Sequence, residues 1–310
     1  MKQQEMNELV RRTVRDALST SRIDIASTLS ELGWRTLADT DKELAVTALF
    51  EEQGRLALST RALDFVAAAE LDVEPNTLFL WPMTNGSNIN DRRRTQRVNV
   101  EGLALQRNVL AGQFILAPVN DRVCVIDISD LKENALSGMA VDAGWAFVSC
   151  SGLIASDVGP WLGLELVASL ALASELVGLA ERMIELATVH VTERHQFGRP
   201  IGANQAVQFR LADAYAAMAG ARSLVSAAWG DGSPEAALTA KTVAGQAHCV
   251  VVDNVLQVGG AIGLSEEHPF PHLVRRGFAV DAVLGSYLDA VGMLTEEPER
   301  IRLAGPIGAF

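Results

Sequence analysis

Two segments of the sequence combine residue types that can hold an anionic ligand. The first, Arg194-His195-Gln196-Phe197-Gly198, places an arginine at the expected end of a helix, and the second, Gln257-Val258-Gly259-Gly260, ends another helix with paired glycines. A guanidinium is a fixed fork of donors that suits phosphate oxygens, and glycine lets backbone N–H groups approach a ligand closely. Each feature also has a purely structural interpretation, because a helix carboxy terminus favours a cation and paired glycines can stop a helix.

Acid–base chemistry would need a positioned carboxylate. Glu165 and Glu175 lie in the long apolar segment 162–194 and are interpreted either as solvated or ion-paired helix residues or, for Glu165, as a buried base with a raised pKa. The five histidines and three cysteines show no metal-ligand spacing, so no metal site is predicted. Cys124 and Cys150 occupy apolar alternating runs and are expected in the core, as in a reducing compartment.

The charge balance argues against nucleic acid as a partner. The 310 residues carry 26 Lys and Arg against 38 Asp and Glu, a net charge of −12, so phosphate backbones would on average be repelled. The basic run Arg92-Arg93-Arg94 with Arg97 is interpreted as a solvated hairpin or as a contact to a phosphate-bearing ligand or an acidic partner subunit. Without an apolar run of membrane-spanning length or a secretion signal, we expect a cytoplasmic protein that has no membrane partner.

The elements that position these residues change in kind twice along the chain. Residues 1–73 show helical spacing of apolar residues, 74–158 contain short β-rich runs separated by turn residues, and 159–310 return to long apolar helices. We predict a mainly α fold of the α+β class: a reduced amino-terminal helical domain, a small central antiparallel β-domain and a carboxy-terminal helical bundle. The helix 162–194 is apolar on most faces, which predicts burial in that bundle or in an oligomer interface.

Three sets of residues together resemble the acyl-CoA dehydrogenase family in order and spacing. They are 193–201 with 204–213, 257–264 with 267–269 and 275, and the amino-terminal segments 31–34 and 51–55. The resemblance implies a flavin-dependent activity, in which a carboxylate takes the α-proton of an acyl-CoA thioester and FAD accepts the β-hydride. It also implies that five residues reach across a dimer to the FAD of a partner subunit: Arg194, Gln196, Phe197, Gln257 and Gly260.

The same resemblance identifies two positions at which the family carries its catalytic carboxylate. These positions are Leu284, in Leu284-Gly285-Ser286, and Ala168, on the first long helix of the bundle. Neither side chain can accept a proton, so Glu165, three residues before Ala168 and on the same helix face, is the weak candidate for a relocated base. Two further departures are Ala261 at the family's second glycine and Thr84-Asn85-Gly86-Ser87 in place of a flavin-binding loop, which is interpreted as a hairpin turn.

The sequence leaves three functions open. The first is a base-lacking subunit of an acyl-CoA dehydrogenase that contributes FAD contacts in trans to a full-length catalytic partner. It resembles the smaller chains of α2β2 heterotetramers from bacterial steroid catabolism, which implies a bulky acyl-CoA, such as a steroid side-chain thioester, bound mainly by the partner. The second is a self-sufficient homo-oligomeric FAD enzyme that uses Glu165. The third is a scaffold subunit without flavin.

Overall fold

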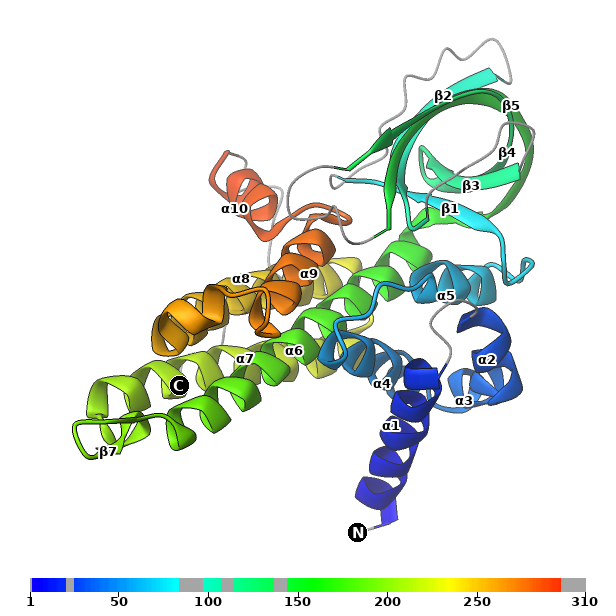
Figure 1. Ribbon diagram of the computed structural model, residues 1–310. Coiled ribbons are helices and arrows are strands. Elements are labelled where there is room, and N and C mark those ends of the chain that lie inside the picture. The colour runs from blue at the N-terminus through cyan, green and yellow to red at the C-terminus, as the bar shows by residue number, and fades with distance from the viewer. Residues whose placement is uncertain (1, 21–24, 84–96, 107–113, 137–143, 297–310) are drawn as a thin grey trace.

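Five helices form the amino-terminal part of the computed structural model, which describes residues 2–20, 25–83, 97–106, 114–136 and 144–296 (Figure 1). They are α1 (Lys2–Thr20), α2 (Ile25–Glu31), α3 (Trp34–Thr40), α4 (Lys42–Arg55) and α5 (Ala62–Glu70). Gly33 separates α2 from α3 with a left-handed φ of 70°, a conformation that glycine commonly adopts where a helix ends. The side chain of Asp41 accepts a hydrogen bond from the Leu44 amide and so caps the first turn of α4.

A small closed β-barrel follows these helices. Its strands are β1 (Leu78–Trp81), β2 (Arg97–Ala104), β3 (Phe114–Val119), β4 (Arg122–Ala135) and β5 (Ala146–Pro160), in the order β1-β2-β5-β4-β3. Four neighbouring pairs are antiparallel, which confirms the predicted antiparallel domain, and the pair β1–β3 that closes the barrel is parallel. The barrel has its own apolar interior, in which Cys124 and Cys150 are buried as expected. Arg97 lies on β2, while Arg92–Arg94 and Thr84–Ser87 lie outside the described residues.

Long helices make up the rest of the described chain (Figure 1). They are α6 (Trp161–Glu193), α7 (Gln205–Asp231), α8 (Pro234–Gly259), α9 (Phe270–Ala282) and α10 (Tyr287–Glu296), with the short hairpin β6 (His195–Gln196) and β7 (Arg199–Pro200) and the 3₁₀ turns η2 (Ile201–Ala203) and η3 (Gly260–Leu264). Ser233 caps α8 by accepting a hydrogen bond from the Ala236 amide, and Pro234 occupies the first turn, where a missing backbone N–H costs no helical hydrogen bond. α6 packs against α4, α7 and α8, so its apolar surface is buried within its own chain.

The crossing of α4 and α6 depends on two glycines. A Cβ atom on Gly178 would lie 2.1 Å from the Glu51 carbonyl oxygen, and one on Gly54 would lie 2.3 Å from the carbonyl oxygen of Glu175. The backbones of the two helices therefore touch at positions where only hydrogen fits. This close approach fixes α4 against the middle of α6.

Two helices are long and apolar enough to cross a membrane by length and composition alone. They are α6 and the continuous helical segment Pro234–Leu264, and 78% and 44% of their most apolar windows are buried inside the protein. The core helix of a globular domain passes the same test, so this property of α6 reflects its position in the bundle.

Candidate functional site

The arginine motif forms an exposed hairpin at the end of α6. Arg194 is the C-cap residue that directly follows α6. The strands β6 and β7 then pair His195 with Pro200 and Gln196 with Arg199. The turn between them holds Phe197 and Gly198 at φ values of 53° and 77°. A left-handed backbone suits glycine but costs about 1 kcal/mol or more at phenylalanine. Phe197 is nevertheless 100% exposed, so no packing within the chain compensates for that strain.

The Arg194 side chain itself is exposed, and within the described residues its guanidinium has no hydrogen bond or ion pair. Its backbone is well anchored, because its amide donates to the His190 carbonyl at 2.9 Å and its carbonyl accepts from Ile201 at 2.8 Å. The structure thus fixes the position of the residue and leaves the cationic group available. An exposed cation at a helix carboxy terminus is also stabilised by the helix dipole without any ligand.

The glycine motif lies at the same end of the bundle. Gln257 is exposed near the end of α8, and Gly260 follows with a φ of 60° and ψ of −149°, a conformation that favours glycine. The Arg210 guanidinium near the start of α7 lies 3.2 Å from the Asn254 side-chain oxygen near the end of α8. In Figure 1 the β6–β7 hairpin extends from this end, where α6 ends and α7 begins. The structure therefore brings the two predicted contact segments to one end of the bundle.

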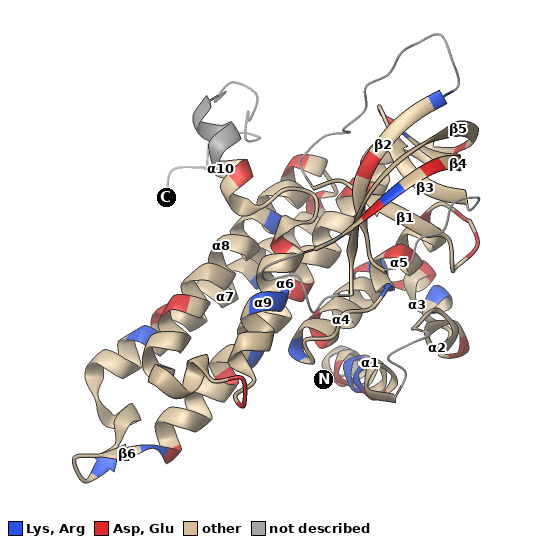
Figure 2. Ribbon diagram, turned by 45° about the horizontal axis from the view of Figure 1, so that its top comes forward, with Lys and Arg blue, Asp and Glu red and all other residues tan. Residues whose placement is uncertain are grey.

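Helix α7, which begins at this end of the bundle, carries few charged residues. Figure 2 shows α7 as mostly uncharged, and only four of its 27 residues are charged at neutral pH. Its exposed residues include Phe209 and Tyr215, each 59% exposed, and Leu224. The sequence singled out α6 for its apolar character, but α7 presents the apolar side chains to solvent.

The two positions of the expected base are buried. Leu284 and Ala168 are each 1% exposed and belong to the helical core. Leu284 has a left-handed φ of 60°, and its amide donates to the Pro82 carbonyl at 2.9 Å, which ties the turn after α9 to the end of β1. Packing rather than solvent surrounds both side chains.

The space between α4, α6 and α9 is filled by an ion pair of Glu175, which the sequence allowed, with Arg276, a partner that the sequence did not identify. Arg276 Nε donates to Glu175 Oε1 at 2.6 Å, Gln53 donates to the other carboxylate oxygen at 2.8 Å, and the Arg276 guanidinium lies 4.6 Å from the centre of the Trp145 ring. Glu175 and Arg276 side chains are 1% and 6% exposed. Burial raises the pKa of Glu175, while the Arg276 guanidinium opposes that rise. Only a cavity of about 10 Å³ remains among these side chains, which at most accommodates one water.

Glu165, the weak candidate base, lies on the second turn of α6. Its carboxyl is partly buried, and this burial raises its pKa, while a hydrogen bond with the Trp161 side chain acts in the opposite direction. A carboxyl with a raised pKa is suited to proton transfer. Within the described residues it makes no salt bridge to a cation.

No metal site emerges from the described part of the chain, where no group of three His, Cys, Asp or Glu side chains could hold an ion. His248 is fully buried in the core instead. Burial lowers the pKa of His248 to about 4, and its Nε2 has no hydrogen-bond partner there.

Comparisons with known proteins agree with this geometry. Residues 167–284 match the family model described as the carboxy-terminal domain of acyl-CoA dehydrogenase. The chain is 33% identical over 201 residues to acyl-CoA dehydrogenase IpdE2 from Mycobacterium tuberculosis, covering 60% of this chain and 62% of that protein. IpdE2 from Mycolicibacterium smegmatis is 34% identical over 130 residues, 42% of each protein. The chain therefore spans less than two thirds of the length of these two relatives.

Solved structures share the fold over nearly the whole chain. A steroid acyl-CoA dehydrogenase variant named Tcur3481-Tcur3483 G363A superposes with a TM-score of 0.71 at 22% identity, covering 96% of this chain and 99% of that one. The ChsE4-ChsE5 complex from Mycobacterium tuberculosis gives a TM-score of 0.66 at 18% identity, covering 97% and 98%. At these identities the likeness establishes the fold, mainly helical with a small sheet, that the sequence predicted.

Proposed function

We propose that this chain, which belongs to the acyl-CoA dehydrogenase family, is a subunit that contributes contacts in trans to an FAD held mainly by a partner chain. The observation that carries the proposal is the Arg194 hairpin. A rigid backbone presents a guanidinium without an ion-pair partner in the described structure, next to a strained and fully exposed Phe197. The strain at Phe197 is not compensated by packing within the described chain, and both features suit a ligand or surface supplied from outside.

The residues at this end fit the flavin cofactor of the family. When bound, FAD supplies the acceptor for the hydride that leaves the acyl β-carbon. Arg194 would donate to its pyrophosphate, because a guanidinium binds phosphate oxygens through a fork of N–H groups. Gly260, with its left-handed φ, leaves the backbone unobstructed for close approach, and no atom within 4 Å would meet a Cβ there. Gln196, Phe197 and Gln257 would complete the contact from the same end of the bundle.

Proton abstraction is assigned to the partner chain in this proposal. Leu284 and Ala168 cannot accept a proton, and the Glu175–Arg276 pair occupies the space between α4, α6 and α9. The acyl-CoA is therefore proposed to bind mainly to the partner. Because the structural relatives include a steroid acyl-CoA dehydrogenase and a two-protein complex, we further propose a heterotetramer in the cytoplasm that acts on a bulky, steroid-type acyl group. The exposed apolar face of α7 would provide part of its interface.

A second candidate function is favoured by Glu165 alone. Its raised pKa and its position three residues before Ala168 would suit a homo-oligomeric enzyme that supplies its own base. A flavin-free scaffold is the third. Purifying the chain alone and together with a full-length partner, then recording flavin absorbance, separates these functions. Flavin only in the presence of the partner supports the proposal, flavin with the chain alone favours Glu165, and flavin in neither contradicts both enzyme functions.

A further inference from the structure

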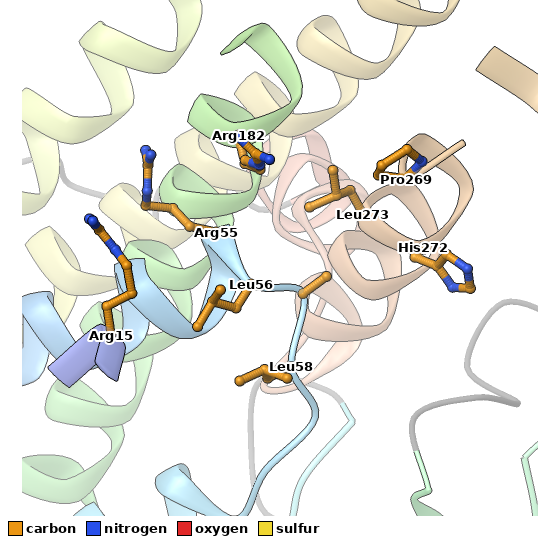
Figure 3. A pocket seen from close by; sticks show the side chains of 9 residues that line it. Arg15, Arg55, Leu56, Leu58, Arg182, Pro269, His272 and Leu273 are labelled. Carbon is orange, nitrogen blue, oxygen red and sulfur yellow. The ribbon is translucent and has the colours of Figure 1, made fainter. Parts of the chain in front are cut away.

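An open pocket of about 610 Å³ lies between α1, the loop after α4, α6 and α9, and is lined by nine residues (Figure 3). Three arginines from three helices line it: Arg15, Arg55 and Arg182. None of the lining residues is acidic, although the chain carries a net charge of −12. Such a gathering of guanidinium groups on one wall stands out against the overall charge.

Carboxylates outside the lining hold these arginines in place. Glu52 accepts from Arg15 at 2.6 and 2.9 Å, and Glu185 accepts from Arg55 at 2.7 Å and from Arg182 at 3.1 Å. The pair with Glu52 uses Nε and Nη2 of Arg15, so that Nη1 has no hydrogen bond among the described residues. Anchored guanidinium groups lose little side-chain entropy when they bind a ligand, so the wall is preorganised.

The ion pairs behind the pocket leave an excess of positive charge. The connected network contains five arginines and four glutamates, which are Arg11, Arg15, Arg55, Arg182, Arg222, Glu51, Glu52, Glu181 and Glu185. Five positive and four negative charges give a net charge of +1 for the network. Glu8 and Asp16 also act on Arg15, so an anion in the pocket would rely on the guanidinium N–H groups that the glutamates do not use.

The opposite wall is apolar and partly aromatic. Figure 3 shows Pro269, Leu273 and His272 on the side away from Arg15 and Arg55, with Leu56 and Leu58 between the two sides and Arg182 near Leu273. The His272 ring is 57% exposed and offers a planar surface. Between Leu56 and Leu58, Ala57 has a left-handed backbone conformation with a φ of 50°. One wall thus suits phosphate oxygens and the other suits a planar, weakly polar body.

We propose that this pocket binds a nucleoside diphosphate group, with its phosphates on Arg15, Arg55 and Arg182 and its base against His272 and Leu273. Arginine forks match phosphate oxygens, and exposed rings and apolar side chains stack on bases. A volume of several hundred Å³ accommodates a ligand of this size. The group can be a free nucleotide or the nucleotide end of a larger cofactor. The proposal does not depend on the Arg194 contacts.

Isothermal titration of the full chain tests the proposal, with ADP, coenzyme A, pyrophosphate and adenosine as probes. We expect saturable binding of ADP or coenzyme A, weaker binding of pyrophosphate, and the weakest binding of adenosine. The tighter of the first two identifies the source of the nucleotide. Arg182→Gln should weaken ADP binding about tenfold or more, since a charge-assisted contact is lost. His272→Ala should weaken ADP but not pyrophosphate.

Arg35→Gln is the matched control, because Arg35 is an exposed arginine paired with Asp72 and does not line the pocket. It should bind ADP as the wild type does. Thermal midpoints of all variants show whether they are folded. The absence of saturable binding by both ADP and coenzyme A would overturn the proposal, as would unchanged binding by a folded Arg182→Gln chain. Equal affinity for pyrophosphate and ADP would contradict recognition of a nucleotide, because the pocket would then bind only the phosphate groups.

Discussion

Glu175 on α6 and Arg276 on α9 form a 2.6 Å ion pair in which both side chains are buried. Gln53 on α4 donates to the same carboxylate, so three helices meet at one charged group. A buried ion pair is stable only while both partners are present, because a lone buried charge keeps its desolvation penalty. The pair and its bond from Gln53 link the amino-terminal helices to the bundle.

Breaking this pair should destabilise the chain strongly. We expect Glu175→Gln to lower the free energy of unfolding by about 3 kcal/mol or more, since Arg276 is left buried without a counter-charge. The exposed pair Lys42–Glu70 provides the control, and Glu70→Gln should cost less than about 1 kcal/mol. Urea denaturation of both variants measures the difference. Equal, small losses would show that the pair contributes no more than a surface contact.

The contact of α4 with α6 should not tolerate a methyl group. Gly178→Ala places a Cβ atom 2.1 Å from the Glu51 carbonyl oxygen, so the helices must separate. We expect a loss of about 2 kcal/mol or more, within the range of overpacked cores. Gly163→Ala, on the exposed first turns of α6, meets no atom within 4 Å and should be neutral or stabilise by up to about 1 kcal/mol. Thermal denaturation measures both variants. Equal midpoints for Gly178→Ala and Gly163→Ala would contradict the close crossing of α4 and α6.

Acid should weaken the fold through His248. Its pKa is about 4 in the folded chain and 6.5 ordinarily, so the unfolded chain binds more protons between these values. The free energy of unfolding therefore falls as the pH decreases through this window, by about 2 kcal/mol between pH 7 and pH 5. His248→Asn should flatten that dependence, whereas His195→Asn on the exposed hairpin should leave it unchanged. Urea denaturation at both pH values provides the measurement, and an unaltered slope in His248→Asn would contradict the assignment.

Much of the helical part could be predicted because its signals are local. The apolar spacing in residues 1–73 and 159–310 indicates helices in the two regions where the structure has α1–α5 and α6–α10, and the predicted helix 162–194 corresponds to α6. The barrel was harder to predict. Strands β2 and β5 pair over the whole length of β2, from Arg97 with Leu153 to Ala104 with Ala146, and such distant partners leave no local pattern. The parallel closure of β1 on β3 depends on the same long-range geometry.

The candidate site divides in a similar way. Arg194 and Gly260 were identified through the resemblance to the acyl-CoA dehydrogenase family, and the structure exposes both at one end of the bundle. The Glu175–Arg276 pair joins residues 101 positions apart, and nothing in the sequence says which of many charged residues will meet. The exposure of α7 was also hidden, because the sequence does not say which faces of a helix its neighbours in a bundle will cover. Burial, rather than composition, distinguishes it from α6.

Placing a carboxylate at position 284, where the acyl-CoA dehydrogenase family carries its catalytic glutamate, should not make the isolated chain an active enzyme. Leu284→Glu buries a charged group at a site that is 1% exposed, so we expect lower stability and no acyl-CoA-dependent reduction of an artificial electron acceptor. Leu284→Gln, a neutral side chain of the same shape, should lose somewhat less stability and be equally inactive. Dehydrogenation by Leu284→Glu would show that an acyl pocket exists beside this residue.

The flavin content of the Arg194→Ala complex tests the central proposal most directly. The chain is purified with its partner as the wild type, Arg194→Ala, Arg194→Lys and the control Arg122→Ala. Arg122 is an exposed arginine of the barrel that is paired with Asp157. The flavin-to-protein ratio and the thermal midpoint are measured for each complex. Loss of a charge-assisted hydrogen bond worth about 1.5–3 kcal/mol weakens FAD retention about 10- to 150-fold. We expect flavin loss in Arg194→Ala at an unchanged midpoint, partial recovery in Arg194→Lys and full flavin in Arg122→Ala. A full flavin complement in Arg194→Ala, with a stability loss that Lys repairs, would contradict the contact in trans and leave Arg194 as a helix-terminal cation.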